Sequence, residues 1–183
     1  MRIVGKCIYL RAIDSEDNKL LFELINDPET EKMVGGSSWP VSKEEQEMWQ
    51  KDQIGRKDIL RCIIVEKDTD NPVGTIILSD IDSKNGVAQV HIKILNEFRG
   101  KGFGTDSLNV IVQFAFFELR LNCLYAEILS YNSASVGMFE KCGFRKEGML
   151  RERIYKNGQY CDILTYSLLV RDVEKENALG NRK

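Results

Sequence analysis

A short glycine-rich stretch, Asn96 to Thr105, contains residue types that suit it to bind an anion. It reads Asn-Glu-Phe-Arg-Gly-Lys-Gly-Phe-Gly-Thr and lies between an alternating, strand-like segment and an apolar-periodic, helix-like one. Glycines at such a junction bring several backbone N–H groups to one small surface, where the helix dipole is also positive. Gly102 and Gly104 lack a Cβ and allow a ligand close to the backbone, while Arg99 and Lys101 add positive charge. The stretch therefore predicts a phosphate or pyrophosphate site.

The spacing of these glycines excludes two common phosphate-binding loops. A P-loop requires G-x-x-x-x-G-K-[ST], which the sequence does not contain. A dinucleotide fingerprint requires G-x-G-x-x-G, and the run from Gly100 to Gly104 does not have that spacing. The run Arg99-x-x-Gly102-x-Gly104 does resemble the [RQ]-x-x-G-x-[GA] signature of the GNAT superfamily of N-acetyltransferases, which hold the pyrophosphate of acetyl-coenzyme A.

A second block, between Asn132 and Asp162, extends this resemblance to one branch of the superfamily. It is similar to the N-x-x-S/A…[YF]-E-K-x-G-F-x-x-E-G…G-x-Y-x-D pattern of the ribosomal-protein and polyamine acetyltransferases (RimJ/RimL-like). The matching residues are 132–144, Glu147-Gly148 and 157–162, together with Ile8-Tyr9-Leu10-Arg11 and Asp17 near the start. The resemblance covers nearly the whole chain and implies acetyl-CoA as co-substrate.

The order of elements expected from the sequence agrees with the GNAT fold. Apolar and alternating runs predict strands at 6–13, 59–66, 73–78, 87–95, 121–129, 144–155 and 160–170. Capping signals and helical spacing predict helices after Asp14, from Ser42, and over 104–119 and 132–142, while 29–41 is expected to be irregular. We expect one α/β (α+β) domain over 1–170 and a polar C-terminal tail over 171–183. The resemblance implies a mixed sheet of about seven strands, splayed between the fourth and fifth and flanked by about four helices.

The resemblance also implies where the coenzyme binds. Pantetheine is expected between the splayed strands 87–95 and 121–129, where it takes up backbone hydrogen bonds like an added strand. The implied positions are backbone groups: those of Ile92, Lys93, Ile94 and Leu95 for pantetheine and the acetyl carbonyl, and the amides of Arg99, Gly100, Lys101, Gly102, Phe103, Gly104 and Thr105 for the pyrophosphate.

Asn132 and Ser135 open the helix that follows the fifth strand, and each has two readings. Asn132 is a good N-cap, and the family uses this asparagine near the pantetheine arm. Ser135 is either a second capping hydroxyl or, as proposed in the ribosomal-protein branch, the group that protonates the departing thiolate.

Two positions depart from the family pattern and leave the acid and base open. Phe139 stands where many relatives carry a tyrosine acid, so it is expected to pack against coenzyme or core. Ser135 or water then donates the proton, or the thiolate leaves without direct help. Gln89 stands where this branch often has a glutamate. His91 lies on the same strand face and, with an ordinary pKa near 6.5, is a candidate base or a merely structural histidine. Glu127, on the facing strand, is the rival base.

Composition and charge limit the classes of partner that this protein can bind. A net charge of −2 and a pI near 5.6 indicate no basic surface for nucleic acid or an anionic membrane, and mildly favour a cationic acceptor. No apolar run is long enough to span a bilayer, and the residues at the start lack the pattern of a leader, so neither a membrane span nor a leader is expected. Its five cysteines are scattered without C-x-x-C spacing, which indicates reduced thiols in the cytoplasm. With one histidine and no paired ligand spacing, no metal site is expected.

The leading function from sequence is an acetyl-CoA-dependent N-acetyltransferase that acts directly on a primary amine. Small amines or polyamines, amino sugars and protein N-termini all remain open as acceptors. A coenzyme-A-binding sensor or pseudoenzyme is the alternative, motivated by Gln89 and Phe139. A nucleotide- or RNA-binding module is weaker because a wider basic patch and stacking aromatics are missing. A homodimer is common in the branch, which makes it one expected assembly.

Overall fold

The computed structural model describes residues 1–36, 39–53, 55–56 and 58–174. The strands are β1 (Ile3–Val4), β2 (Ile8–Ala12), β3 (Leu60–Glu66), β4 (Pro72–Asp82), β5 (Val87–Ile94), β6 (Cys123–Leu129), β7 (Arg145–Lys156) and β8 (Gln159–Leu169). The helices are α1 (Asn18–Asn26), α2 (Pro28–Met33), α3 (Lys43–Asp52), α4 (Phe103–Phe117) and α5 (Ser133–Lys141), with short 3-10 turns η1 (Ser15–Asp17) and η2 (Asn96–Phe98).

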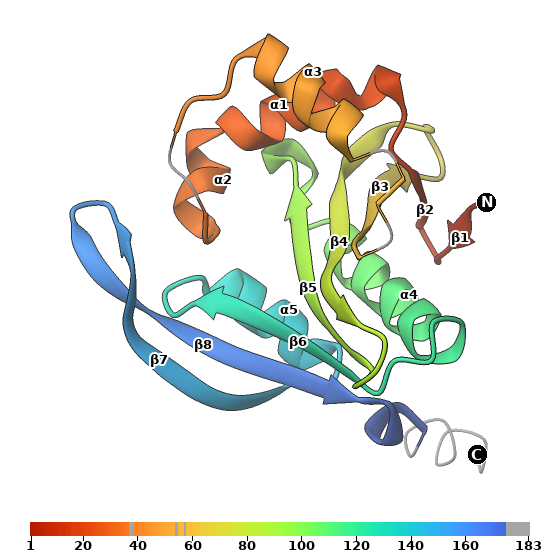
Figure 1. Cartoon of the computed structure of the whole chain (residues 1–183), viewed down its shortest axis with the longest axis vertical. Coiled ribbons are helices and arrows are strands. Elements are labelled where there is room, and N and C mark those ends of the chain that lie inside the picture. The colour runs from red at the N-terminus through yellow and green to blue at the C-terminus, as the bar shows by residue number, and fades with distance from the viewer. Residues whose placement is uncertain (37–38, 54, 57, 175–183) are drawn as a thin grey trace.

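All eight described strands form one sheet in the order β1-β2-β3-β4-β5-β6-β8-β7. Only β5 and β6 are parallel neighbours, and their pairing stops after three residues, at Gln89 and Tyr125. Beyond that point the two strands run apart (Figure 1). The expected mixed sheet with a splay between these strands is confirmed. The additional strand relative to the sequence prediction is β1, which pairs with β2.

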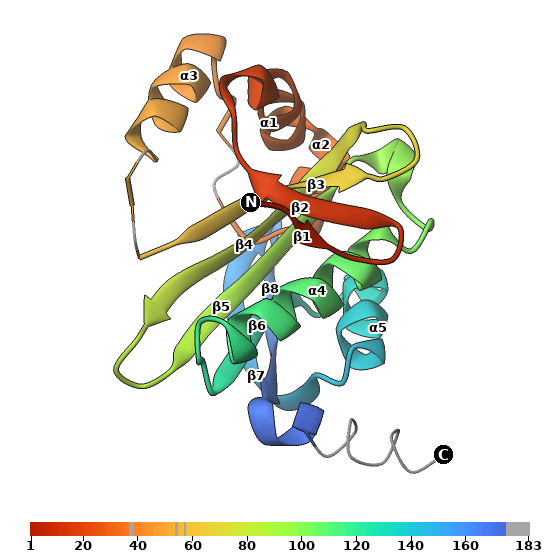
Figure 2. The same ribbon diagram turned by 90° about the vertical axis from the view of Figure 1, so that its right-hand side faces the viewer.

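Helices cover both faces of the sheet. On one face α4 and α5 pack over the main core, to which α4 contributes Leu108, Ile111 and Ala115 at helical spacing. On the other face α1 packs Leu20 and Leu24 in a smaller cluster that also includes Trp49 of α3. Figure 1 shows α1, α2 and α3 gathered at one end of the sheet, and Figure 2 shows α4 and α5 away from them.

The expectation of an irregular segment over 29–41 was wrong for its first part, because α2 begins at Pro28. Asp27 caps this helix by accepting hydrogen bonds from the N–H groups of Glu29 and Thr30. Proline at the first helical position lacks only an N–H that the helix would leave unpaired anyway. Asp27-Pro28 therefore ends one helix and begins the next. Residues 37 and 38 of the same segment lie outside the described part.

The described end of the chain is attached to the domain. Residues 170–174 are helical, and Val173 is buried against the main core. The rest of the predicted tail, 175–183, lies outside the described residues. In the part of the chain that the structure describes, no helix is long and apolar enough to cross a membrane.

Candidate active site

The glycine-rich loop adopts a backbone that glycine favours at two positions. Gly100 has φ +75° and Gly102, the N-cap of α4, has φ +86°, both in the left-handed region. A Cβ built on either residue would meet nothing within 4 Å, so both face open space. This loop is therefore a shallow surface made of backbone at the beginning of α4.

The amides of this loop are available to a ligand. The N–H groups of residues 100–105 donate no hydrogen bond to any described residue, and the first internal bond of α4 is from Asp106 N–H to the carbonyl of Gly102. Lys101 places its Nζ 4.9 Å from the centre of the Phe98 ring, beside the loop. Unpaired amides, a helix N-terminus and one lysine together suit a pyrophosphate.

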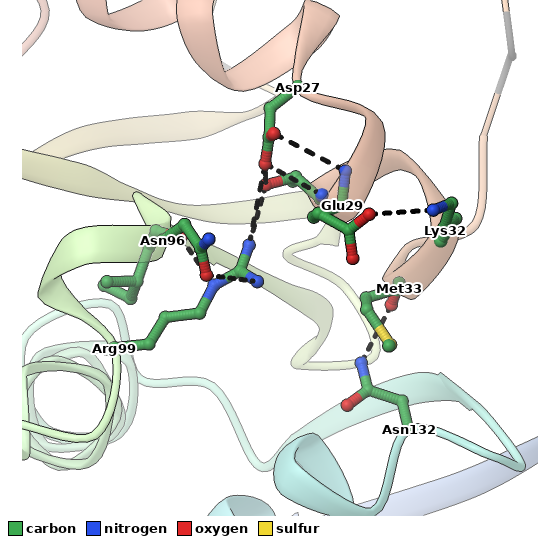
Figure 3. A network of polar contacts seen from close by, with 9 residues as sticks. Asp27, Glu29, Lys32, Met33, Asn96, Arg99 and Asn132 are labelled. Atoms are coloured by element: carbon green, nitrogen blue, oxygen red, sulfur yellow. Dashed lines mark hydrogen bonds and ion pairs between the residues drawn. The ribbon is translucent and has the colours of Figure 1, made fainter.

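Arg99 contributes its backbone to this loop but sends its side chain elsewhere (Figure 3). Its Nε donates to the carbonyl of Ile94 at 3.1 Å, and Nη2 donates to Thr30 Oγ1 at 2.7 Å. Nη2 also lies 4.0 Å from Asp27 Oδ2. The guanidinium charge expected at the anion site is therefore engaged at the N-terminus of α2.

Gly104 brings the loop against α5. A Cβ at this residue would lie 2.8 Å from Met138 Sδ, closer than packing allows. The same position would be 3.8 Å from Ile92 Cδ1 and 3.9 Å from Ile94 Cγ1. The side chains of Ile92 and Ile94 thus lie under the first turn of α4, which directs Lys93 between them to the opposite face of the sheet.

Asn132 is the predicted cap of α5 and has a second contact. Its Oδ1 accepts a hydrogen bond from Ser135 N–H at 3.1 Å, and its Nδ2 donates to the carbonyl of Met33 at 2.8 Å (Figure 3). Ser135 is half-buried in the first turn of α5. The cap confirms the structural reading of Asn132, whereas the coenzyme roles of both residues stay predictions.

Phe139 lies in the core. It is 2% exposed and packs edge-to-face on Phe144, with ring centres 4.9 Å apart and planes at 87°. This geometry favours the packing reading among those offered by the sequence.

His91 and Glu127 lie on the two sides of the opening between β5 and β6. Each is the second residue past the last pair, Gln89 with Tyr125, so both lie on the same sheet face. Both side chains are exposed. The register thus brings the two predicted base candidates to the mouth of the splay.

The hydrogen-bond partners of His91 favour one of its two neutral tautomers. Its Nε2 lies 2.8 Å from Ser79 Oγ, and that hydroxyl donates to Asp80 Oδ2 at 3.0 Å. Because the single hydroxyl proton goes to the carboxylate, Ser79 Oγ accepts from His91 Nε2–H. Neutral His91 therefore keeps its lone pair on Nδ1. Asp80 reaches Ser79 from a bulge in β4, where it has φ +50°.

The surroundings of His91 favour its neutral form. Desolvation lowers the pKa of His91 although solvent reaches the ring, and the positive charges of Lys93 and Arg61 lower it further. The Asp80 carboxylate acts in the opposite direction. A histidine that is neutral at pH 7 is available to accept a proton.

We use the name polar face for the surface of β3, β4 and β5 that bears Arg61, Ser79, His91 and Lys93. Cross-strand pairing places Arg61 and His91 in one row on either side of Ile77. Arg61 holds its guanidinium 4.9 Å over the Trp49 ring and donates from Nε to Gln53 Oε1 at 3.1 Å. The polar face was missed in the sequence because its residues come from three strands, and alternation indicates a face but not its use.

Helix α2 is contacted from both sides of the splay, and Figure 3 shows the contacts of Arg99 with Asp27 and of Asn132 with Met33. Arg99, after β5, holds its N-terminus, while Tyr131 Oη donates to the carbonyl of Lys32 at 2.6 Å. Lys156, at the end of β7, is 3% exposed and forms an ion pair with Glu31. These contacts connect both sides of the opening and the β7–β8 hairpin through one short helix.

These residues fit coenzyme A. From Val90 to Ile94, β5 pairs with β4 on one edge and has no partner in β6 on the other. That edge leads directly into the unpaired amides of 100–105, as a pantetheine arm followed by a pyrophosphate requires. Among the described residues, no three His, Cys, Asp or Glu side chains lie together as a metal site.

Comparison with known proteins identifies the family. Residues 8–145 match the protein family described as "Acetyltransferase (GNAT) domain". YokL, an SPbeta prophage-derived uncharacterized N-acetyltransferase of Bacillus subtilis, is 33% identical over 170 residues, which are 93% of this chain and 94% of that protein. A solved structure of spermidine N-acetyltransferase from Vibrio cholerae in complex with CoA and spermine has a TM-score of 0.85 at 26% identity, covering 90% of this chain and 96% of that one. A dodecameric structure of spermidine N-acetyltransferase from Vibrio cholerae has a TM-score of 0.77 at 28% identity, covering 88% and 93%. The chain belongs to the GNAT family of acetyltransferases.

Proposed function

We propose that this N-acetyltransferase moves the acetyl group of acetyl-CoA directly to a primary amine at the mouth of the splay between β5 and β6. The observation that carries the proposal is the unpaired edge of β5 from Val90 to Ile94, which continues into the free amides of 100–105. The backbone of 92–95 would bind pantetheine and polarise the acetyl carbonyl. The amides of 100–105 would bind the pyrophosphate, whereas the Arg99 amide, also expected there from the sequence, donates to the carbonyl of Asn96 at 3.2 Å.

The chemical step needs a base for the incoming amine. The amine nitrogen attacks the thioester carbonyl carbon, the C–N bond forms, and the C–S bond breaks as the thiolate leaves. We assign the ammonium proton to His91 Nδ1, because Nε2–H is occupied by Ser79 and the ring is held neutral. Glu127, on the other side of the opening, is the rival acceptor of that proton.

The thiolate either takes a proton from a donor as it leaves or leaves without direct help. Phe139 has no hydroxyl and is buried in the core, so it is not assigned a proton-transfer role. We assign the proton to Ser135 Oγ or to water, with Asn132 holding the start of α5 beside the pantetheine arm.

Release of coenzyme A thiol tests the function. We expect release from acetyl-CoA with at least one member of a panel containing spermidine, a nucleotide-linked amino sugar and peptides with free N-termini. If acetyl-CoA raises the melting temperature but no amine releases thiol, the second candidate, a coenzyme-A-binding sensor, gains support. The core placement of Phe139 is the observation that favours that candidate.

Branch, assembly and location complete the proposal. The pattern from Asn132 to Asp162 supports the RimJ/RimL-like branch. All five cysteines are free, which supports a reducing, cytoplasmic location. A dodecameric relative supports assembly into an oligomer, of which a homodimer is the simplest form. Chromatography with light scattering would measure the assembly.

A further inference from the structure

The polar face bears two positively charged side chains, Arg61 and Lys93, near the place where the amine must enter. Arg61 and Lys93 both act electrostatically on His91, and Lys93 is two residues beyond His91 on the same strand face. Two residues of strand separate their Cα atoms by about 7 Å. An acceptor whose amine lies at His91 would therefore place its neighbouring groups at Lys93.

The carboxylates of α2 and of its cap do not offset this charge, because each already has a cationic partner. Asp27 lies 4.0 Å from the Arg99 guanidinium, and Glu29 pairs with Lys32 at 2.7 Å (Figure 3). Glu31 pairs with Lys156. The segment that borders the opening is therefore acidic in sequence but locally neutralised in the fold.

Lys93 differs from these cations. It is half-buried in a pocket formed with α1, α2 and the following residues, including Ile25, Glu31 and Gly35. The described residues provide it with neither an ion pair nor a side-chain hydrogen bond. Desolvation lowers the pKa of Lys93, and the repulsion of Lys156 and Arg61 lowers it further. A half-buried ammonium group without a counterion is a place where an anion would be stabilised.

Two other carboxylates lie near the opening without reaching Lys93. Asp80 accepts a hydrogen bond from the Ser79 hydroxyl, and its negative charge raises the pKa of His91. Glu127 lies on β6, across the splay, and is exposed. Neither is among the charges that affect Lys93 most.

We propose that the amine acceptor carries a carboxylate or phosphate group that pairs with Lys93, and that polyamines are poor acceptors. The proposal rests on the proposed function, since it describes the substrate of the same site. It reverses the expectation from the acidic pI, because local charges, not the charge of the whole chain, surround the acceptor. It also separates this chain from its spermidine-acetylating structural relatives.

Matched pairs of amines test the proposal. The pairs are O-phosphoethanolamine with ethanolamine, and glycine with glycinamide, and spermidine is assayed beside them. We expect kcat/KM, from thiol release, to be at least about tenfold higher for the anionic member of one pair than for its neutral analogue and for spermidine. The advantage should shrink as ionic strength rises from about 0.05 M to about 0.5 M. Which pair responds distinguishes carboxylate from phosphate.

Three variants test Lys93 itself. We expect Lys93→Met to raise KM about tenfold for the anionic acceptor, while KM for acetyl-CoA changes less than about twofold. Lys93→Glu should reverse the order and favour spermidine. Lys84→Met removes one exposed lysine from the β4–β5 turn and should leave both constants unchanged. Circular dichroism and melting of each variant establish that it is folded.

The outcomes separate this proposal from the proposed function. Turnover that is fastest with spermidine, or that Lys93→Met leaves unchanged, would overturn the anionic acceptor and leave the acetyltransferase intact. Thiol release with none of the amines, including the peptides and amino sugar of the first panel, would count against the acetyltransferase as well.

Discussion

The proposed coenzyme side and the polar face of this molecule would recognise their ligands with different parts of the chain. The coenzyme side consists of the free edge of β5, residues 100–105 and the start of α5, and it presents mainly backbone groups. The polar face presents side chains, such as Arg61 and Lys93, from strands that are distant in sequence. Backbone recognition requires a particular run of glycines, which leaves a motif. Side-chain recognition requires only that the fold brings the side chains together, so it leaves no motif in the sequence.

Gly102→Val should have the largest effect, because it blocks the coenzyme side. The side chain would enter the open space above the amides, where Gly102 has φ +86°. Losing one or two hydrogen bonds to a charged ligand costs about 3 kcal/mol, more than 100-fold in the Kd of acetyl-CoA by calorimetry. Gly158→Val is the matched control, since Gly158 has φ +82° and open space in the β7–β8 turn. Equal loss of affinity in both variants would mean that backbone strain, not the loop, is responsible.

His91→Gln should have the next largest effect, and it tests chemistry on the polar face. Removal of a general base lowers kcat/KM by about 100-fold. In the wild-type enzyme the neutral base exists above its pKa, so activity should rise with pH along a limb below the ordinary histidine value of 6.5, because the pKa is lowered. That limb should disappear in His91→Gln. An unchanged pH profile would transfer the role to Glu127 or to water.

The Asp80 carboxylate near His91 provides a second test of this assignment. Asp80 raises the pKa of His91, so Asp80→Asn should move the limb to lower pH. Asp82→Asn is the control, because its side chain accepts from the N–H groups of Lys84 and Asn85, which an amide oxygen can still do. A shift in the control as large as that in Asp80→Asn would indicate a general charge effect.

Glu31→Ala should destabilise the helix that joins the two regions. It leaves the Lys156 ammonium, 3% exposed, without its carboxylate partner, which costs about 2 kcal/mol in the free energy of unfolding. Glu29→Ala removes an ion pair that is exposed on both sides, so it should cost less than about 0.5 kcal/mol. Urea unfolding measures both. A similar small cost for the two variants would show that the buried pair contributes no more than the surface pair.

The parts of the fold that were predictable from sequence are those fixed by local signals. The capping box at Ser42, the helical spacing in α4 and the Asn132 cap all involve residues within one or two turns, and the structure has each of them. The splay followed from resemblance to the family. The start of α2 was missed because proline reads equally as the end of one helix and the beginning of another.

The contacts of α2 and of the polar face were not predictable from the sequence, because they join residues that only the fold brings together. Glu31 and Lys156 are 125 positions apart in the chain, and nothing local distinguishes them from solvated charges. Ser79 and Asp80 come together with His91 only through the β4–β5 register and the bulge. A single sequence lists the residues of such a site but does not show that they lie close together in the fold.

Arg99→Met should have the smallest effect on coenzyme binding, although Arg99 is the first residue of the motif. Its guanidinium contacts Ile94, Thr30 and Asp27, not the loop amides. We expect a loss of about 1 kcal/mol in the free energy of unfolding, and a change below about threefold in the Kd of acetyl-CoA. Lys101→Met, which removes the lysine beside the loop, should raise that Kd about tenfold. If Arg99→Met had the larger effect on affinity, its side chain would have to leave α2 when coenzyme binds, and the coenzyme side would depend on side-chain charge as the polar face does.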